Sequence, residues 1–180
     1  MAARTAQIGR LVSQLLSHAM VSHRAQSMTA ERVDLRDVLA LALSDAVPAA
    51  MPRDIAVETD AGEVPVLVSG DALNLREAVR NIIENAVHHG ARTRIVASVR
   101  RDGEESSIEI ADDGPGIPPS QWADAVRRFY RVTQDGPGSG LGLAIASDVV
   151  RGHGGTLSFA MRGDGLFSVR ITFPGSSVKP

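Results

Sequence analysis

Two asparagines and a histidine share one helical stretch of the chain. Asn81, Asn85 and His88 are four and three residues apart, so at about 100° per residue they fall on one arc of a helix. Apolar residues of the same stretch follow the three-four spacing of a buried face, namely Leu75, Ala78, Val79, Ile82, Ile83, Ala86 and Val87. Amides and an imidazole beside such a face could contact a ligand that carries phosphates and a metal ion. A plain surface helix would show the same row, so this stretch alone does not decide the function.

Two glycine clusters lie further along the chain. Asp112, Gly114 and Gly116 follow a predicted strand, and residues 136–143 lead into a predicted helix. Glycine allows positive φ and close approach of a ligand to the backbone, and free amides at a helix start favour phosphate. Ordinary turns explain either cluster alone, but the two together favour a phosphate-bearing ligand. Neither completes a Walker loop or a dinucleotide fingerprint, since no Gly-Lys-Ser/Thr occurs and position 143 is leucine.

The patterns around these residues predict the elements that position them. The central helix begins after an N-cap at Asp71 and ends at Gly90. Another helix passes through Val38 to Val47 and is expected to stop at Pro48 and Pro52. Further helices are predicted at 120–126 and 141–151, and strands at 33–35, 55–58, 64–68, 93–100, 107–111, 156–161 and 167–173. These strands form mainly hairpins, which predicts an α+β fold: a two-layer sandwich of about three helices on one mixed five- or six-stranded sheet.

A separate helix is predicted at the N-terminus. Ile8, Leu11, Val12, Leu15, Leu16 and Ala19 form a narrow apolar seam within residues 6–22. Such a seam needs a partner, which could be the main domain or a helix of a dimeric bundle. Residues 22–30 are polar and are expected to form a linker.

Composition excludes several classes of protein. The 180 residues carry a net charge of -2, which argues against a nucleic-acid surface. The chain has no cysteine, which excludes disulfides and thiol chemistry. No apolar run approaches the roughly 18 residues of a membrane span, and no signal-peptide pattern opens the chain. We therefore expect a soluble, cytoplasmic segment.

The order of the motifs resembles a known ATP-binding domain. An asparagine helix, then Asp-x-Gly-x-Gly at 112–116, then Gly-x-Gly-Leu-Gly-Leu at 138–143 is similar to the domain shared by sensor histidine kinases, gyrase, ninety-kilodalton heat-shock chaperones and mismatch-repair ATPases. Residues 128–131, Arg-Phe-Tyr-Arg, resemble the aromatic box of the histidine kinases, and His153-Gly154-Gly155 resembles their ending. The resemblance covers roughly residues 31–174. It implies a helix and linker at 1–28 similar to the end of a dimerisation hairpin, a catalytic domain at 29–175 and a tail at 176–180.

The resemblance also implies a role for each motif residue. Asp112 would accept a hydrogen bond from the adenine amino group, and Gly114 and Gly116 would let the base and sugar lie against the backbone. Asn85 would bind Mg²⁺, with ATP phosphates and waters completing its coordination. Asn81 and Arg131 would act as catalytic residues near the phosphates. The other residues that the resemblance places in the ATP site are His88, His89, Ile117, Phe129, Tyr130, Gly138, Ser139, Gly140, Leu141, Gly142 and Leu143.

Three positions refine this expectation. The hydrolytic members of the superfamily carry a glutamate base four residues before the metal asparagine, where this chain has Asn81, which favours phosphoryl transfer over hydrolysis. His88 stands where these kinases often carry lysine, and at neutral pH histidine is the weaker phosphate partner. His89 stands where tyrosine or histidine is usual.

The resemblance implies further partners that the chain itself lacks. It has no phosphoacceptor box, because neither His18 nor His23 has the expected neighbours. A sensor kinase would pass phosphate to histidine on a dimerisation domain and then to a response regulator. The resemblance also implies a homodimer, which a segment outside this sequence could anchor in the inner membrane. Two alternatives stay open: a nucleotide-binding regulatory module without transfer activity, and a serine kinase of the anti-sigma-factor type.

Overall fold

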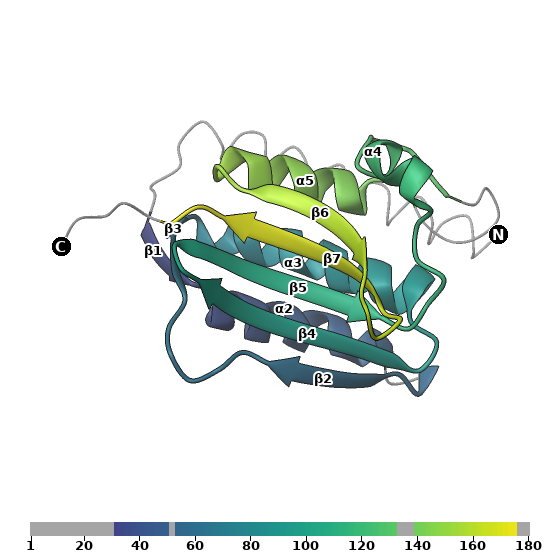
Figure 1. Ribbon diagram of the computed structural model, residues 1–180, viewed down its shortest axis with the longest axis horizontal. Helices are drawn as coiled ribbons and strands as arrows, with labels where there is room; N and C mark the ends of the chain where they lie inside the picture. Colours follow the sequence, from purple (N-terminus) through teal and green to yellow (C-terminus); the bar gives the residue numbers. More distant parts are fainter. Residues whose placement is uncertain (1–30, 51–52, 133–138, 176–180) are drawn as a thin grey trace, which may run out of the picture.

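The main sheet of the protein has five strands and is covered by helices on one face. The computed structural model describes residues 31–50, 53–132 and 139–175 (Figure 1). The strand order is β2-β4-β5-β7-β6, with β2 parallel to β4 and all other pairs antiparallel. The bounds are β2 Ala56–Asp60, β4 Arg94–Asp102, β5 Glu105–Asp112, β6 Thr156–Met161 and β7 Phe167–Phe173. The expected α+β sandwich with a mixed five-stranded sheet is confirmed.

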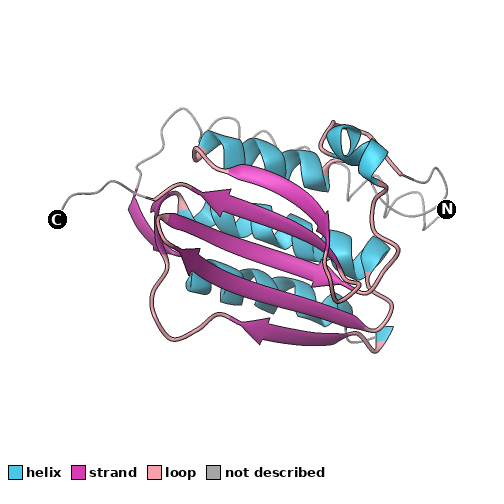
Figure 2. Cartoon of the chain, in the orientation of Figure 1, coloured by secondary structure: helices cyan, strands magenta, loops and turns pink. Residues whose placement is uncertain are grey.

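The helical layer lies behind the sheet in the view of Figure 2. Its helices are α2 (Leu35–Ala50), α3 (Ala72–Asn85) and α5 (Gly142–Gly152), and α3 packs against both of the others. The 3₁₀ turn η3 (Pro119–Gln121) and the short α4 (Trp122–Ala125) connect the sheet to the segment before α5. None of the helices in the described residues is long and apolar enough to cross a membrane.

The core forms where the apolar face of α3 meets the sheet. Leu75, Val79, Ile82 and Ile83 are buried, as their spacing predicts. They belong to one cluster with sheet residues Ile95, Ile108, Ile110 and Ile171. Each such side chain contributes about 1.5–3 kcal/mol on burial, so α3 is held firmly against the sheet. Residues at the end of α3 are therefore fixed relative to the end of β5.

Two further strands pair with each other and do not join the main sheet. β1 (Glu31–Asp34) and β3 (Leu67–Gly70) form an antiparallel pair at the start of α3. β3 corresponds to the strand predicted at 64–68, but it begins later, at Leu67, and ends at Gly70. The predicted N-terminal helix, the linker, the middle of the 132–140 loop and the tail lie outside the described residues.

The expectation that Pro48 ends α2 is wrong. The helix continues through Pro48 to Ala50. Proline removes one donor, which here would have bonded to the carbonyl of Ser44 four residues earlier. Ser44 is exposed, so water can satisfy that carbonyl and the last turn persists.

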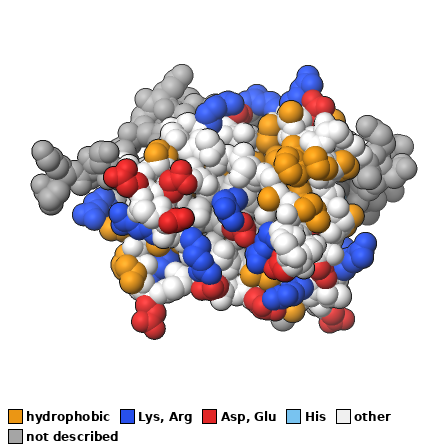
Figure 3. All heavy atoms as spheres, viewed as in Figure 1, with side chains coloured by type: hydrophobic (Ala, Val, Ile, Leu, Met, Phe, Trp, Pro, Cys, Tyr) orange, Lys and Arg blue, Asp and Glu red, His pale blue; other side chains and the backbone are white. Residues whose placement is uncertain are grey.

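The face of the sheet away from the helices carries interspersed acidic and basic side chains (Figure 3). Arg94 pairs with Glu58 at 2.7 Å across β4 and β2. Glu109 on β5 is buried and pairs with Arg162 at 3.0 Å and with Arg170. Exposed pairs such as Arg94–Glu58 contribute little to stability.

Candidate functional site

The C-terminal end of α3 is a π-helical turn. Ala86–Gly90 forms η2, in which the Ala91 amide donates to the Ala86 carbonyl at 2.7 Å. The predicted end at Gly90 is confirmed, but the wider winding moves His88 off the arc that a regular α-helix would give it. His88 and His89 are both exposed, and their ring centroids lie 6.4 Å apart. π-turns occur often at functional sites, because they insert one residue without breaking the helix.

Asp112 is a buried carboxylate at the end of β5. Asp112 is only 3% exposed, and within the described part of the chain its side chain accepts one hydrogen bond, from the Gly114 amide at 2.9 Å. Burial raises the pKa of Asp112 to about 6, the Gly114 amide lowers this pKa, and the neighbouring Asp113 raises it. A buried carboxylate with so few donors among the described residues is suited to a ligand that brings its own N–H group.

Asp113 has the opposite environment although it is the next residue. Its oxygens accept bonds from the amides of Arg92, Thr93 and Arg94 at 2.8–3.1 Å and from the Thr93 hydroxyl at 2.6 Å. Desolvation works against the charged form, but these bonds outweigh it and hold the pKa of Asp113 well below its usual range. Asp113 therefore fixes the start of β4 and has no acceptor role left for a ligand.

Gly114 and Gly116 are required by contacts within the protein. A Cβ on Gly114 would lie 1.9 Å from the carbonyl oxygen of Gly90, at the end of the π-turn. Gly116 has φ +67°, and a Cβ there would lie 2.7 Å from the ring of Phe167. The loop after β5 thus packs directly on the end of α3, which brings Asp112 beside the π-turn. Figure 1 shows the C-terminal ends of β5 and α3 at the same end of the molecule.

The start of α5 meets α3 at Asn81. Asn81 is buried, and its Nδ2 donates to the Glu77 carbonyl at 2.8 Å and to Glu77 Oε1 at 3.3 Å. Its Oδ1 faces Gly142, where a Cβ would lie 3.4 Å from that oxygen. The side chain of Asn81 is therefore held by α3 and presented to the first turn of α5, while the half-buried Asn85 lies one turn further on.

The loop before α5 closes at its base. The Phe129 amide donates to the Gly140 carbonyl at 2.8 Å, and both residues have positive φ, 64° and 68°. The Phe129 side chain is 66% exposed, whereas the Tyr130 hydroxyl donates to Gln121 at 2.9 Å. Ser139 Oγ accepts from the Leu141 amide at 3.3 Å. Gly138 lies outside the described residues.

The remaining predicted residues divide into buried and exposed groups. Ile117, Leu141 and Leu143 are buried in the core, so only their backbone could face a ligand. Arg128 donates to Asp148 of α5 at 2.9 Å. Arg131 acts on His89 as a nearby positive charge, so it lies on the side of the π-turn.

His153 has a structural position that its motif alone did not reveal. Its Nε2 accepts from the Asp71 amide at 3.0 Å, and its Nδ1 lies 2.8 Å from the Val149 carbonyl. The neutral tautomer with its proton on Nδ1 satisfies both contacts. His153 thereby joins the end of α5 to the N-cap of α3, whose Asp71 side chain accepts from the Asn74 amide at 2.9 Å. Together with the Asn81–Gly142 contact, it fixes the two helices at both ends.

Comparison with known proteins shows the family to which this chain belongs. Residues 70–177 match the family described as histidine kinase-, DNA gyrase B- and HSP90-like ATPase. The probable sensor histidine kinase TcrY of Mycobacterium tuberculosis is 32% identical over 180 residues, which cover 97% of this chain and 37% of that protein. The sensor protein KdpD of Escherichia coli is 31% identical over 169 residues, covering 92% and 18%. The chain thus spans well under half the length of these relatives.

Solved structures show the same fold. The mycobacterial sensor histidine kinase MprB matches with a TM-score of 0.71 and 32% identity, over 82% of this chain and 98% of that one. The ATP binding domain of PrrB from Mycobacterium tuberculosis matches with a TM-score of 0.67 and 30% identity, over 82% and 98%. The chain therefore belongs to the histidine kinase-, DNA gyrase B- and HSP90-like ATPases, and within them to the ATP-binding catalytic domains of sensor histidine kinases.

Proposed function

We propose that this chain binds Mg-ATP between β5, the end of α3 and the start of α5, and transfers the γ-phosphoryl group to a histidine. The observation that carries the proposal is the environment of Asp112: a buried carboxylate, next to the π-turn, to which the described residues supply one donor. The adenine amino group would supply the second donor, and it favours the ionised carboxylate. Gly114 and Gly116 would support the base from the adjoining loop.

The polyphosphate end would lie towards α5. Asn81 is oriented by Glu77 towards Gly142, and the start of α5 offers free amides to phosphate. Ser139, Gly140 and Gly142 would flank the phosphates, with Phe129 and Tyr130 shaping the base of the loop. His88, His89 and Arg131 would supply positive charge from the π-turn and the loop. Transfer would then depend on positioning and charge neutralisation.

Mg²⁺ fits this site only together with the nucleotide. Among the described residues, no three His, Cys, Asp or Glu side chains lie close enough to hold a metal ion. The Asn85 amide oxygen would be a single ligand, and Mg²⁺ bound through few protein groups keeps phosphates and waters in its shell. The metal would supply charge neutralisation of the β- and γ-phosphates; Asn85 would orient it.

The acceptor would be supplied by another segment or chain. We propose that residues 1–28 continue a dimerisation hairpin, that residues 29–175 form the catalytic unit, and that a response regulator receives the phosphate. The relatives KdpD and TcrY far exceed this chain in length. Homodimerisation and any membrane anchor would involve segments outside this sequence.

A transfer assay separates this proposal from its alternatives. The chain is incubated with labelled ATP, Mg²⁺ and a separate hairpin that bears a phosphoacceptor histidine box. Acid-labile, base-stable label on the hairpin supports a histidine kinase. Acid-stable label on a partner protein indicates a serine kinase, and nucleotide binding with no label under any metal condition indicates a regulatory module.

A further inference from the structure

The side-chain amide of Asn81 has a fixed orientation, because its nitrogen is engaged by two acceptors of the protein itself. Nδ2 donates to the backbone carbonyl of Glu77 at 2.8 Å and, over a longer distance of 3.3 Å, to Oε1 of the Glu77 carboxylate. A carbonyl and, at neutral pH, a glutamate carboxylate only accept hydrogen bonds. An amide turned the other way would place its oxygen against both acceptors and lose both bonds. The nitrogen of Asn81 is therefore held towards Glu77.

Arg80 holds the Glu77 carboxylate in place for this contact. Arg80 Nη2 donates to Glu77 Oε1 at 2.6 Å and Arg80 Nε donates to Oε2 at 3.2 Å, so the guanidinium meets both carboxylate oxygens. A two-point contact of this kind fixes the plane of a carboxylate. Oε1 also accepts from Asn81, which links the three side chains by hydrogen bonds. The orientation of the amide is therefore set within α3, before any ligand binds.

The oxygen of Asn81 faces the start of α5. Because the nitrogen is held by Glu77, Oδ1 lies on the other side of the amide group, where a Cβ on Gly142 would be 3.4 Å from it. Among the described residues, the hydrogen bonds of the Asn81 side chain are those of its nitrogen. An amide oxygen can accept a hydrogen bond or bind a cation, but it has no proton to give. A ligand at the start of α5 therefore meets an acceptor at this position.

Phosphate oxygens are acceptors too, so they make no favourable direct contact with this face of the amide. Two acceptors that face each other repel unless a cation or a hydrogen-bond donor lies between them. Mg²⁺ prefers oxygen ligands and usually keeps several waters, whose protons can be donated. The partner that suits the Asn81 oxygen beside a polyphosphate is therefore the metal ion or a water that it holds.

We propose that Glu77 is a positioning residue, which turns the Asn81 oxygen towards the ligand so that Asn81 serves the metal ion or its water and makes no direct bond to phosphate. The inference rests on the proposed function and names the part of Mg-ATP that Asn81 meets. Asn81 and Asn85 would then both contribute to the metal-dependent part of nucleotide affinity. An asparagine free to turn would instead present its N–H group to phosphate even without metal.

Calorimetry with and without Mg²⁺ separates a metal-directed role from a phosphate-directed one. An ATP analogue is titrated into the whole chain, Asn81→Ala, Glu77→Leu and Glu77→Gln, once with Mg²⁺ and once with EDTA. We expect Asn81→Ala and Glu77→Leu to lower the affinity about threefold to tenfold with Mg²⁺ and to leave it within about twofold with EDTA. Glu77→Gln keeps an acceptor oxygen for the Asn81 amide, so it should retain most of the affinity.

The two outcomes that overturn the inference differ from failure of the proposed function. Equal losses with and without Mg²⁺, which a purely structural role of Glu77 or a phosphate contact of Asn81 would give, overturn it. Unchanged affinity of both Asn81→Ala and Glu77→Leu overturns it as well. A parent chain that does not bind the ATP analogue under either condition refutes the proposed function itself.

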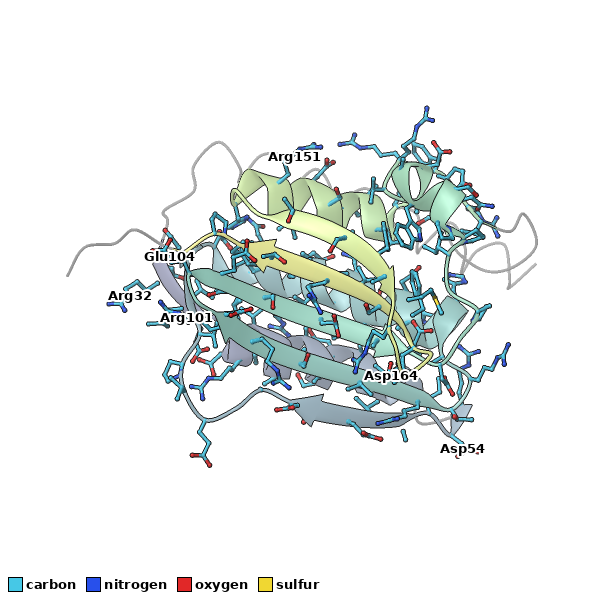
Figure 4. All side chains as sticks on the ribbon, in the orientation of Figure 1. Arg32, Asp54, Arg101, Glu104, Arg151 and Asp164 are labelled. Carbon is cyan, nitrogen blue, oxygen red and sulfur yellow. The ribbon has the colours of Figure 1, made fainter. Side chains whose placement is uncertain are left out.

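A matched control removes another carboxylate that pairs with Arg80. Glu84 Oε1 accepts from Arg80 Nη1 at 3.0 Å on the same helix, so Glu84→Gln perturbs the same arginine and leaves the contact of Glu77 with Asn81 in place. Glu104, labelled in Figure 4, lies in the hairpin between β4 and β5, and Glu104→Gln controls for net charge alone. Both controls should leave the affinities within about twofold. A loss in either that equals the loss in Glu77→Leu would overturn the inference.

A measurement on the parent chain does not depend on how the variants fold. The side-chain NH₂ resonances of Asn81 should hardly move when the ATP analogue is added with EDTA, because both protons stay on Glu77. The side-chain carbonyl carbon of Asn81 should shift when Mg²⁺ is present as well. Large shifts of the NH₂ resonances with metal-free nucleotide, or a carbonyl carbon that does not respond to Mg²⁺, would contradict the inference.

Discussion

Replacing Asp112 by asparagine should make the protein more stable at neutral pH while it weakens nucleotide binding. The fold raises the pKa of Asp112 from 3.8 to about 6, because burial disfavours its charged form. In the unfolded chain this carboxyl ionises near its ordinary pKa, so the folded state loses stability as pH rises from about 4 to about 6. Above that range the full cost of the buried charge is present. An uncharged amide of similar shape avoids it.

The size of the effect follows from the shift. Roughly two pH units at about 1.4 kcal/mol each give an upper bound of about 3 kcal/mol. The asparagine amide group needs a partner of its own, and its bond with the Gly114 amide is weaker than that of a carboxylate, so we expect a gain of about 1–2 kcal/mol. For a chain of this size, that corresponds to an increase of about 2–8 °C in Tm.

Thermal unfolding at several pH values measures this prediction. The stability advantage of Asp112→Asn should be full at pH 7.5 and vanish near pH 4. Asp113→Asn is the matched control, for which we expect a change in stability of the opposite sign. The fold lowers the pKa of Asp113, so this variant should be less stable than the parent at pH 7.5. The difference in stability should shrink as the pH falls through the acid range. An Asp112→Asn variant that is less stable at pH 7.5, or whose difference from the parent does not change with pH, would refute the reasoning.

Three further predictions concern the supports of the site. Gly114→Ala places a Cβ 1.9 Å from the Gly90 carbonyl oxygen, so we expect a loss of about 2–4 kcal/mol in chemical denaturation, whereas Gly163→Ala, at an open position, should cost under about 1 kcal/mol. His153→Phe leaves the Asp71 amide without its acceptor and should cost about 1–3 kcal/mol, with faster hydrogen exchange at the start of α3 and little change at β4. Asn85→Ala should reduce the Mg²⁺-dependent part of ATP affinity and leave metal-free binding unchanged, as calorimetry with and without Mg²⁺ would show.

Regular elements of this fold could be read from the sequence because their packing follows local periodicity. The apolar spacing of α3 identifies the residues that are buried, and Asp71 caps the helix as its type predicts. Alternating residues identify both hairpins. These signals lie within a few residues of one another along the chain, so they need no knowledge of tertiary contacts.

Features set by long-range contacts could not be predicted in the same way. The π-turn accompanies the approach of the Gly114 loop to Gly90, and nothing in residues 86–90 announces it. Asp112 and Asp113 are the same residue type, and only their hydrogen-bond partners distinguish them. Asp113 is held by Thr93 and its neighbours, whereas Asp112 accepts from the Gly114 amide. Pairing of β1 with β3 likewise depends on residues more than thirty positions apart.

The candidate site shows the same division. Motif order predicted the site residues, and the structure places Asn81 beside Gly142 and Asp112 beside Gly90. That these residues bind ATP stays a prediction. Motif order was not enough to find the contact of Arg53 with the Val87 carbonyl, because a lone arginine between a helix and a strand carries no pattern. The pairing of Arg128 with Asp148 depends on a helix that begins fourteen residues later, and it also escaped the sequence.

The most direct test of the account is a crystal structure of this chain with a non-hydrolysable ATP analogue and Mg²⁺. We predict the adenine amino group within hydrogen-bonding distance of Asp112, and the metal bound by the Asn85 amide oxygen and the phosphates. A nucleotide bound elsewhere, or an adenine that leaves the Asp112 carboxylate without a new donor, would contradict it.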